Sequence, residues 1–256
     1  MRVIIKNADF QISGMKDISE LLNEVQTNFG GIGDDIGIVE NLFRALGAGG
    51  SNGIWAKIKN LYMPVLSIPS DGINALYDII AKTDYPGSNY TIETKRGVSP
   101  TTLGGTIGAK VSSAEITTSG ASFFCVVTQS SRQTLGSSSS VFSQAYGITI
   151  NWQKNDFRVN GASSTSLTVS HSDQFTKPCY LAVSADTNGV RHCVTRGGYL
   201  DGALTAGSAY DMLSGSSSWA STAVLACCEG LTPGECDIIA SALDTFITDF
   251  GVLCVN

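Results

Sequence analysis

Acidic side chains are the first candidates for chemistry, because two carboxylates on one strand can act as acid and nucleophile in cleaving a glycosidic bond. A Glu-x-Asp-x-Glu spacing would place three carboxylates on one face of a strand, since alternate strand residues point the same way. That spacing occurs nowhere in the 256 residues. The nearest acidic cluster consists of Glu229, Glu235 and Asp237. We assign it to the cap of the last predicted helix, so the acidic residues predict no catalytic site.

Histidines and cysteines offer little further chemistry. His171 and His192 are the only two histidines, which excludes a metal or acid–base site built on several imidazoles. The seven cysteines are odd in number and show no Cys-x-x-Cys spacing of the kind that binds zinc. The glycine-rich segment 47–53 lacks the Lys-Ser/Thr ending of a phosphate-binding loop. The residues therefore predict a chain that is not an enzyme and that holds no metal or cofactor.

Aromatic rings and polar turn residues form the one pattern with potential for binding a ligand. Asp186 and Asn188 lie in the predicted turn SADTNGV, and Trp152 and Trp219 offer flat rings on which a sugar could stack. Each also has a structural interpretation, since Asp and Asn are common turn formers and tryptophan fills cores and protomer contacts. These four residues are the predicted ligand-binding residues, with both interpretations open.

Composition and charge limit the partners. Hydrophobic residues make up 43% of the chain and charged residues 15%, so the chain can bury a sizeable core. The formal net charge of −6 argues against nucleic acid or an anionic membrane as a partner. No secretory signal is visible, and no apolar run approaches the length of about 18 residues that a membrane helix needs. Cys125 and Cys179 lie within apolar runs, which predicts reduced core thiols in a protein made in a cytoplasm.

A heptad pattern dominates the first fifty residues. Apolar residues from Met15 onward recur at alternating spacings of three and four. The members after Met15 are Ile18, Leu22, Val25, Phe29, Ile32, Ile36, Val39, Phe43 and Leu46. Large residues at one core position and β-branched residues at the other favour three or more helices. We therefore expect a helical oligomerisation stalk and a homotrimer.

The same segment has a second interpretation. Gly30, Gly31, Gly33 and Gly37 fall in its middle, and each costs about 1 kcal/mol in a helix interior. Asp34 could cap a second helix, which would give a helical hairpin. The stripe therefore predicts either helix association between chains or a hairpin packed within one chain.

The remainder of the chain changes character near residue 85. Before it, residues 51–84 are predicted to form a helical neck, with its second helix capped by Ser70. After it, short β-prone runs separated by Gly, Ser, Asn and Asp predict two packed antiparallel sheets. A closing helix follows, with Thr232 as N-cap and Glu235 three residues later in a capping box. The expected organisation is an anchor at 1–14, a stalk at 15–50, a neck at 51–84 and a sandwich at 85–256.

Several of these runs carry a family resemblance. The chain resembles concanavalin A-like (laminin-G-like) lectin domains in the runs SFFCVVTQ, DFRVNG, CYLAVSAD and VRHCVTRGG, and in TAVLACCEG with its following Leu231, Thr232 and Glu235. The opening MRVIIKNADF and the segment WAKIKNLYMPVL look like the start of virion-associated proteins from phages of gut Bacteroidota. The resemblance implies a mainly β, concanavalin A-like antiparallel β-sandwich (jelly roll) with an N-terminal coiled-coil stalk and a short C-terminal helix.

The resemblance also implies a function. We expect a structural protein on the surface of a phage virion, such as a head fibre, a decoration protein or a tail appendage, assembled in the bacterial host cytoplasm. Residues 1–50 would attach it to other virion proteins, and the lectin-like sandwich would adhere to host surface polysaccharide. The alternatives are a soluble carbohydrate-binding module and a glycoside hydrolase on the same fold, which the missing Glu-x-Asp-x-Glu spacing disfavours.

Overall fold

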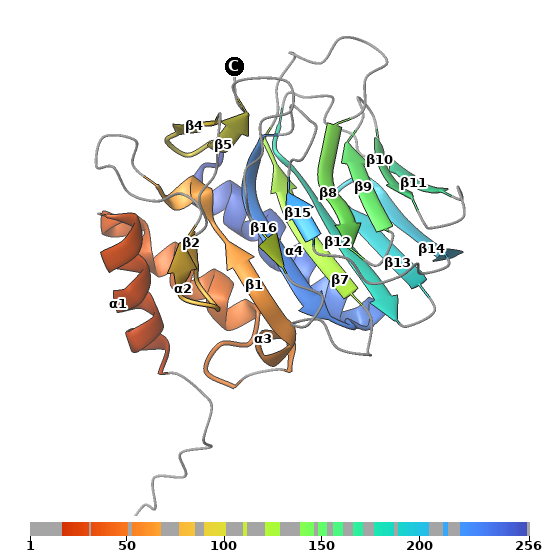
Figure 1. Ribbon diagram of the computed structural model, residues 1–256. Helices are drawn as coiled ribbons and strands as arrows, with labels where there is room; N and C mark the ends of the chain where they lie inside the picture. The colour runs from red at the N-terminus through yellow and green to blue at the C-terminus, as the bar shows by residue number, and fades with distance from the viewer. Residues whose placement is uncertain are drawn as a thin grey trace, which may run out of the picture.

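The structure is a computed structural model that describes residues 17–30, 32–50, 53–67, 77–84, 90–100, 110–111, 121–128, 139–145, 148–152, 156–160, 166–170, 177–186, 189–204, 212–214 and 221–254. Half of these residues lie in antiparallel strands, which form two sheets (Figure 1). The predicted mainly β architecture with a C-terminal helix is confirmed, and the two sheets are consistent with a β-sandwich.

The first sheet contains the longest buried strands. Its order is β14-β13-β12-β7-β16-β1-β2-β3, and a hairpin of β4 and β5 joins it at β16. The strands in this order are β14 (Gly198–Leu204), β13 (Gly189–Thr195), β12 (Cys179–Asp186), β7 (Ala121–Val127), β16 (Thr222–Glu229), β1 (Ile58–Tyr62), β2 (Tyr77–Asp78) and β3 (Thr83–Asp84), with β4 (Tyr90–Glu93) and β5 (Gly97–Pro100) beside them.

The second sheet lies on one face of the first. Its order is β11-β10-β9-β8-β15-β6, and β11 contacts β13 and β14 of the first sheet. The strands in this order are β11 (Ser166–Ser170), β10 (Asp156–Asn160), β9 (Ile148–Trp152), β8 (Ser139–Ala145), β15 (Met212–Ser214) and β6 (Lys110–Val111).

Both faces of the first sheet are covered, which explains why its strands are continuous apolar runs. In β7, Phe123 and Phe124 point to opposite faces, and both are buried. Phe124 belongs to the core that the helices share with the sheet, whereas Phe123 is buried on the other side. A strand covered on one side only would alternate apolar and polar residues.

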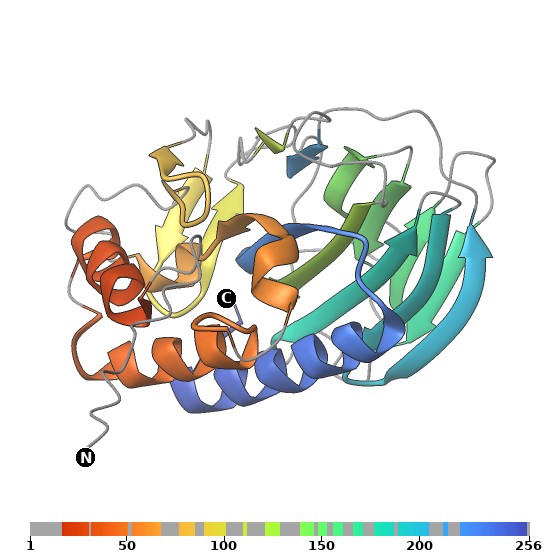
Figure 2. The ribbon, with the colours of Figure 1, turned by 90° about the horizontal axis from the view of Figure 1, so that it is seen from below.

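The helix α4 (Pro233–Phe250) covers the face of the first sheet that the second sheet leaves open. It packs on β12 and β13, and α2 (Ile36–Ala45) packs beside it, so that the two helices form a layer against the strands (Figure 2). The predicted capping box is present: Thr232 accepts from the backbone N–H of Glu235, and the Glu235 carboxylate accepts from the Thr232 N–H. Gly251 ends the helix in the left-handed conformation that glycine adopts at little cost.

The predicted stalk is a helical hairpin on this layer. The first helix, α1 (Ile18–Phe29), ends at Gly30, and a short 3-10 turn, η1 (Gly33–Asp35), leads into α2. Gly30 and Gly33 both have a φ of 57°, a conformation that breaks an α-helix and that costs glycine least. Of the two interpretations that the sequence left open, the structure shows the helical hairpin.

The heptad stripe lies within the core of its own chain. Ile18, Val25, Phe29, Ile32, Val39, Phe43 and Leu46 are buried, and Leu22 and Ile36 are partly buried against the same core. A stripe that the sandwich and α4 already cover is not available as the seam of a coiled coil. The periodicity therefore reflects packing inside the molecule, and the homotrimer remains a prediction without this support.

The predicted helical neck is wrong over most of its described length. Only α3 (Ile54–Lys57) and a short 3-10 helix, η2 (Pro64–Leu66), are helical in its described residues, and the residues directly after α3 form β1, which pairs with β16 inside the first sheet. The second neck helix is replaced over residues 77–84 by the hairpin of β2 and β3. Leu61 and Tyr62 point to opposite faces and are both buried, so a strand buries the apolar residues of this segment on two sides.

A buried carboxylate holds the turn after β2. Asp78 Oδ1 accepts hydrogen bonds from the backbone N–H groups of Leu61, Ile80 and Ala81 at 3.2, 2.9 and 3.1 Å, and Oδ2 accepts from Asn60. Burial raises the pKa of Asp78 above its usual value, and these hydrogen bonds oppose the rise without cancelling it. The ionised Asp78 carboxylate therefore lowers the stability of the folded chain, even though its hydrogen bonds hold the turn.

Replacement of Phe43 by alanine tests the hairpin. Phe43 is buried and its ring centroid lies 5.3 Å from that of Trp55, so its loss leaves a cavity in the shared core. We expect Phe43→Ala to lower the free energy of unfolding by about 3–5 kcal/mol in a urea titration, with no change of molar mass in light scattering. The exposed Asn41→Ala on the same helix is the control. Loss of an oligomer without loss of stability would contradict an intrachain core.

Replacement of Asp78 by asparagine tests the buried charge. The pKa of Asp78 is higher in the folded chain than in the unfolded chain. The contribution of Asp78 to the free energy of unfolding is therefore largest at a pH below the unfolded-state pKa, and it is lost as the pH rises through the folded-state pKa. We therefore expect the unfolding free energy of the unsubstituted chain to fall relative to that of Asp78→Asn as the pH rises above the ordinary pKa of an aspartate, in urea titrations. The exposed Asp84→Asn in the same hairpin is the control. Parallel pH profiles for the unsubstituted chain and Asp78→Asn would refute a costly buried charge.

Candidate functional site

An exposed tyrosine marks the free edge of the first sheet. Tyr199 lies near the start of β14, the last strand at that edge, and its side chain is 70% exposed. The other exposed large hydrophobic side chains of the described residues are Ile238 at 45% and Leu253 at 49%. Tyr199 pairs with Val194 of β13, and Val194 packs against the helix side of the sheet. The ring is thus presented on the same side of the sheet as α4.

The turn before Tyr199 is fixed to α4. The Arg196 guanidinium places Nε and Nη2 at 2.8 and 2.7 Å from one carboxylate oxygen of Asp244, and Nη1 donates to the Pro178 carbonyl at 3.1 Å. Within the turn, Thr195 Oγ1 accepts from the Gly197 N–H at 3.2 Å and donates to the Gly198 carbonyl at 3.3 Å. These contacts reduce the freedom of the turn, so the tyrosine ring stands on a rigid support.

A histidine and a carboxylate stand beside the ring. His192, on β13, is buried, and its ring centroid lies 5.9 Å from that of Tyr199 with an interplanar angle of 30°. Its Nε2 lies 3.5 Å from Asp237 Oδ1 in the first turns of α4, and the Asp237 side chain is 64% exposed. We call Tyr199, His192 and Asp237 the Tyr199 platform. It combines a flat aromatic face with a carboxylate acceptor, the pair of features that can stack on and hydrogen-bond a polyhydroxylated ligand.

The other two members of the acidic cluster have structural roles. Glu235 lies in the capping box, and both of its carboxylate oxygens are 2.7 Å from Lys57 Nζ. Burial acts to raise the pKa of Glu235, but the hydrogen bonds from Lys57 and Thr232 outweigh it and hold the pKa below its usual value. Glu229 lies 2.8 Å from Lys59 Nζ. The assignment to the helix cap is confirmed for Glu235, whereas Asp237 faces solvent beside His192.

Two of the four sequence-predicted binding residues, Trp152 and Asp186, lie in described strands other than those of the Tyr199 platform. Trp152 is the last residue of β9 in the second sheet, and Asp186 ends β12 in the first sheet, where it pairs with Gly189. The turn after Asp186 is at the opposite end of β13 from the turn that carries Tyr199. Asn188 and Trp219 lie outside the described residues. Trp152 and Asp186 thus belong to different sheets, and the binding roles of all four residues stay predictions.

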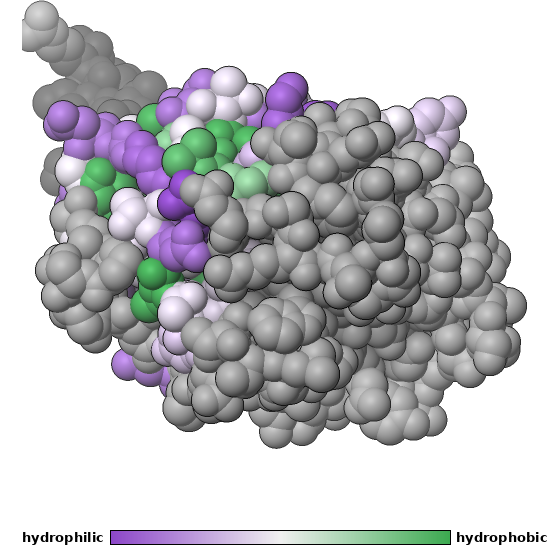
Figure 3. Space-filling view, turned by 90° about the horizontal axis from the view of Figure 1, so that it is seen from above, coloured by the Kyte–Doolittle hydropathy of each residue, from purple (hydrophilic) through white to green (hydrophobic). Residues whose placement is uncertain are grey.

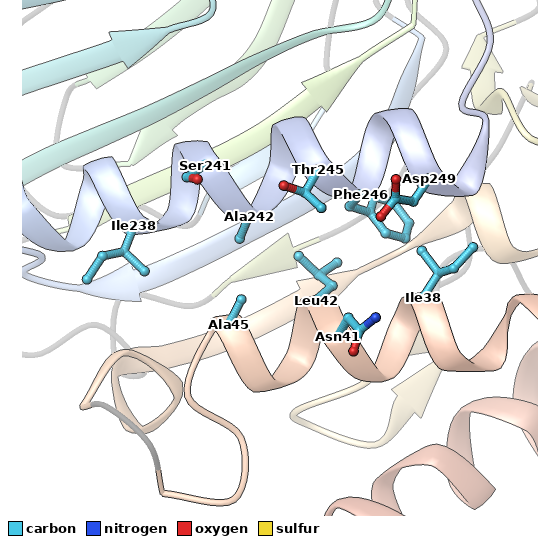
Figure 4. A pocket seen from close by; sticks show the side chains of 10 residues that line it. All are labelled: Ile38, Asn41, Leu42, Ala45, Ile238, Ser241, Ala242, Thr245, Phe246 and Asp249. Atoms are coloured by element: carbon cyan, nitrogen blue, oxygen red, sulfur yellow. The ribbon is translucent and has the colours of Figure 1, made fainter.

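A groove between α2 and α4 is the second surface feature. It has a volume of about 320 Å³, and its lining comes from both helices (Figure 4). The lining residues are Ile38, Asn41, Leu42, Ala45, Ile238, Ser241, Ala242, Thr245, Phe246 and Asp249. On the opposite side of the molecule, apolar areas of the described residues are small and bordered by hydrophilic ones (Figure 3). The groove lacks an exposed aromatic ring, because Phe246 is buried.

Within the described ranges, no group of three or more His, Cys, Asp or Glu side chains is placed to hold a metal ion. No described helix combines the length and apolar character needed to span a bilayer. All seven cysteines are free thiols, and six of them are buried.

Comparisons with known proteins identify the fold. No family model matches the chain. No curated protein matches it either. Among solved structures, the Trypanosoma rangeli sialidase in complex with sialic acid has a TM-score of 0.56 at 11% identity, over 82% of this chain and 39% of the sialidase. The same sialidase with 2,3-difluoro-KDN has a TM-score of 0.56 at 11% identity, over 91% of this chain and 39% of that one. The chain thus spans about two fifths of the length of these sialidases.

The likeness corrects one expectation. The chain was predicted to be no enzyme, whereas the proteins that share its fold are sialidases, which are glycoside hydrolases. The absence of a Glu-x-Asp-x-Glu spacing is therefore no ground for excluding an enzyme, because it tests for one catalytic arrangement only. At 10–11% identity the likeness establishes the fold and places no catalytic residue in this chain.

Proposed function

We propose that this chain is a carbohydrate-binding domain and that the Tyr199 platform is its binding site. The observation that carries the proposal is the 70% exposed ring of Tyr199 on a supported sheet edge. An exposed aromatic ring costs solvation free energy that is recovered when an apolar face of a ligand covers it. The sialic acid complex of a sialidase with this fold supports a carbohydrate as the ligand class.

The platform favours a neutral sugar. A pyranose presents an apolar face of C–H groups, which can stack on the Tyr199 ring, and hydroxyl groups at its rim. The Asp237 carboxylate, 64% exposed, can accept hydrogen bonds from those hydroxyls, and hydrogen bonds to an ionised acceptor are stronger than neutral ones. The same carboxylate would repel the carboxylate of sialic acid. We therefore infer a neutral glycan, in contrast to the sialic acid bound by the sialidases.

A glycan array followed by titration calorimetry tests the site. We expect binding to neutral glycans, and Tyr199→Ala should weaken the best of them about tenfold, which corresponds to about 1.4 kcal/mol of lost stacking. Asp237→Asn should weaken it less, because an amide still accepts a hydrogen bond. Leu253→Ala and Asp249→Asn are the matched controls, an exposed apolar residue and a second carboxylate of α4. A blank array, or full affinity in Tyr199→Ala, would refute the platform.

The setting we propose is the surface of a bacteriophage virion, where such a domain would adhere to host surface polysaccharide. The seven free thiols support assembly in a reducing cytoplasm, since oxidising compartments favour disulfides. The likeness of the opening residues to virion-associated proteins of gut Bacteroidota phages supports the same setting.

Purified particles test this setting. Antibodies raised against the chain should decorate intact virions in immunogold electron microscopy, because a surface domain is accessible without disruption of the particle. Pre-incubation of the antibodies with the purified chain should abolish the labelling. If the antibodies label only unassembled protein and leave intact particles unlabelled, the domain is not on the virion surface.

A further inference from the structure

The groove between α2 and α4 is built as a binding surface for an apolar segment. Leu42, Ala242 and Phe246 are buried residues of its lining, and Ile238 and Ile38 lie toward its two ends (Figure 4). The small side chain of Ala45 faces α4 across the gap, so the two helices do not fill the space between them. Ile238 remains 45% exposed, so it extends the apolar lining of the groove to the surface.

The charge around the groove selects the kind of occupant. The helix α4 carries four carboxylates and no Lys or Arg between Pro233 and Phe250. Asp249 is among the lining residues of the groove itself, whereas the one basic residue of α2, Arg44, is paired with Glu40 at 2.6 Å. Two copies placed face to face would bring these acidic helices together, in a chain of net charge −6. An apolar segment with basic residues fits better.

The chain contains such a segment directly before α1. Residues 1–16, MRVIIKNADFQISGMK, precede the described part of the chain and combine the run Val3, Ile4 and Ile5 with the basic residues Arg2, Lys6 and Lys16. With Asp9 as the one acidic residue, the segment is positive in a negative chain. It leads into α1, which packs against α2, and sixteen extended residues reach about 50 Å, several times the length of α2.

We propose that residues 1–16 bind in the groove between α2 and α4 of their own chain. The apolar run covers Ile238 and Leu42, and the basic residues lie near Asp249, the carboxylate in the lining of the groove. The segment then holds α2 and α4 together from outside, opposite the sandwich. This role concerns the helical layer and does not depend on the Tyr199 platform.

Photo-crosslinking of the full chain tests this inference. A benzophenone amino acid replaces Ile5, and an equal mixture of unlabelled and nitrogen-15-labelled protein is irradiated. Mass spectrometry should find crosslinks from position 5 to peptides of α2 or α4, each with both halves carrying the same isotope. Crosslinks that join the two isotopes would show binding to a second copy and overturn the proposal. Crosslinks to other elements, or none, would overturn it as well.

Variants of the groove separate specific binding from chance proximity. Ile238→Lys places a charge of the segment's own sign in the apolar lining at an exposed position and should lower the crosslink yield about fivefold. Leu253→Lys makes the same change at a residue of similar exposure outside the groove, and it should leave the yield unchanged. Circular dichroism of both variants establishes that the fold is intact. Equal yields in the two variants would refute the groove as the binding site.

Discussion

The antiparallel pairing of β1 with β16 is the contact on which the remaining structure depends. It joins residues 58–62 to residues 225–228 in the interior of the first sheet, so an early and a late segment of the chain meet in one core. Lys57 pairs with Glu235 and Lys59 with Glu229 at 2.7 and 2.8 Å, which fixes the strand beside the start of α4. Because β1 follows the hairpin of α1 and α2, this pairing also places both helices over the sheet. The helical layer is therefore part of the sandwich and not an appendage to it.

The same arrangement leaves two surfaces uncovered. The helix α4 passes over β12 and β13, and Tyr199 at the edge strand β14 remains exposed beside the first turns of the helix. On its outer side α4 meets α2, and the small residues between them leave the groove open. One surface is an aromatic ring with a carboxylate, and the other is apolar with carboxylates around it. Their chemistry differs enough that a sugar suits the first and a peptide segment the second.

Much of the fold could be predicted from local patterns. The runs SFFCVV and TAVLACC are strands because continuous apolar runs of this length bounded by turn residues suit strands covered on both faces. The capping box at Thr232 and Glu235 defined the start of the last helix. The stripe from Ile18 to Leu46 was also real, but periodicity states only that one face is buried. It does not state whether the covering surface belongs to the same chain.

Other features depended on long-range contacts. The segment IKNLY is short and mixes apolar with polar residues, so its pattern suits a strand or a helix until a partner strand is known. Asp78 ends up buried because its acceptor atoms meet the backbone of Leu61, seventeen residues away. The position of Tyr199 beside His192 could have been predicted. A hairpin that turns at Arg196 and Gly197 pairs VRHCVT with GYLDG, and side-chain alternation then places the two rings on the same face. The exposure of Tyr199 follows from where α4 lies across the sheet, which local sequence does not encode.

Hydrogen exchange of the whole chain, followed by mass spectrometry at increasing sub-denaturing urea, tests the central claim most directly. If α1, α2 and β1 belong to the sandwich core, amides in α2 should exchange only by the same global opening as those in β7 and β16, with the same free energy and urea dependence. Exchange of α2 through a low-energy opening that is insensitive to urea, while β7 and β16 stay protected, would contradict the account. The N-terminal helices would then be a separable unit.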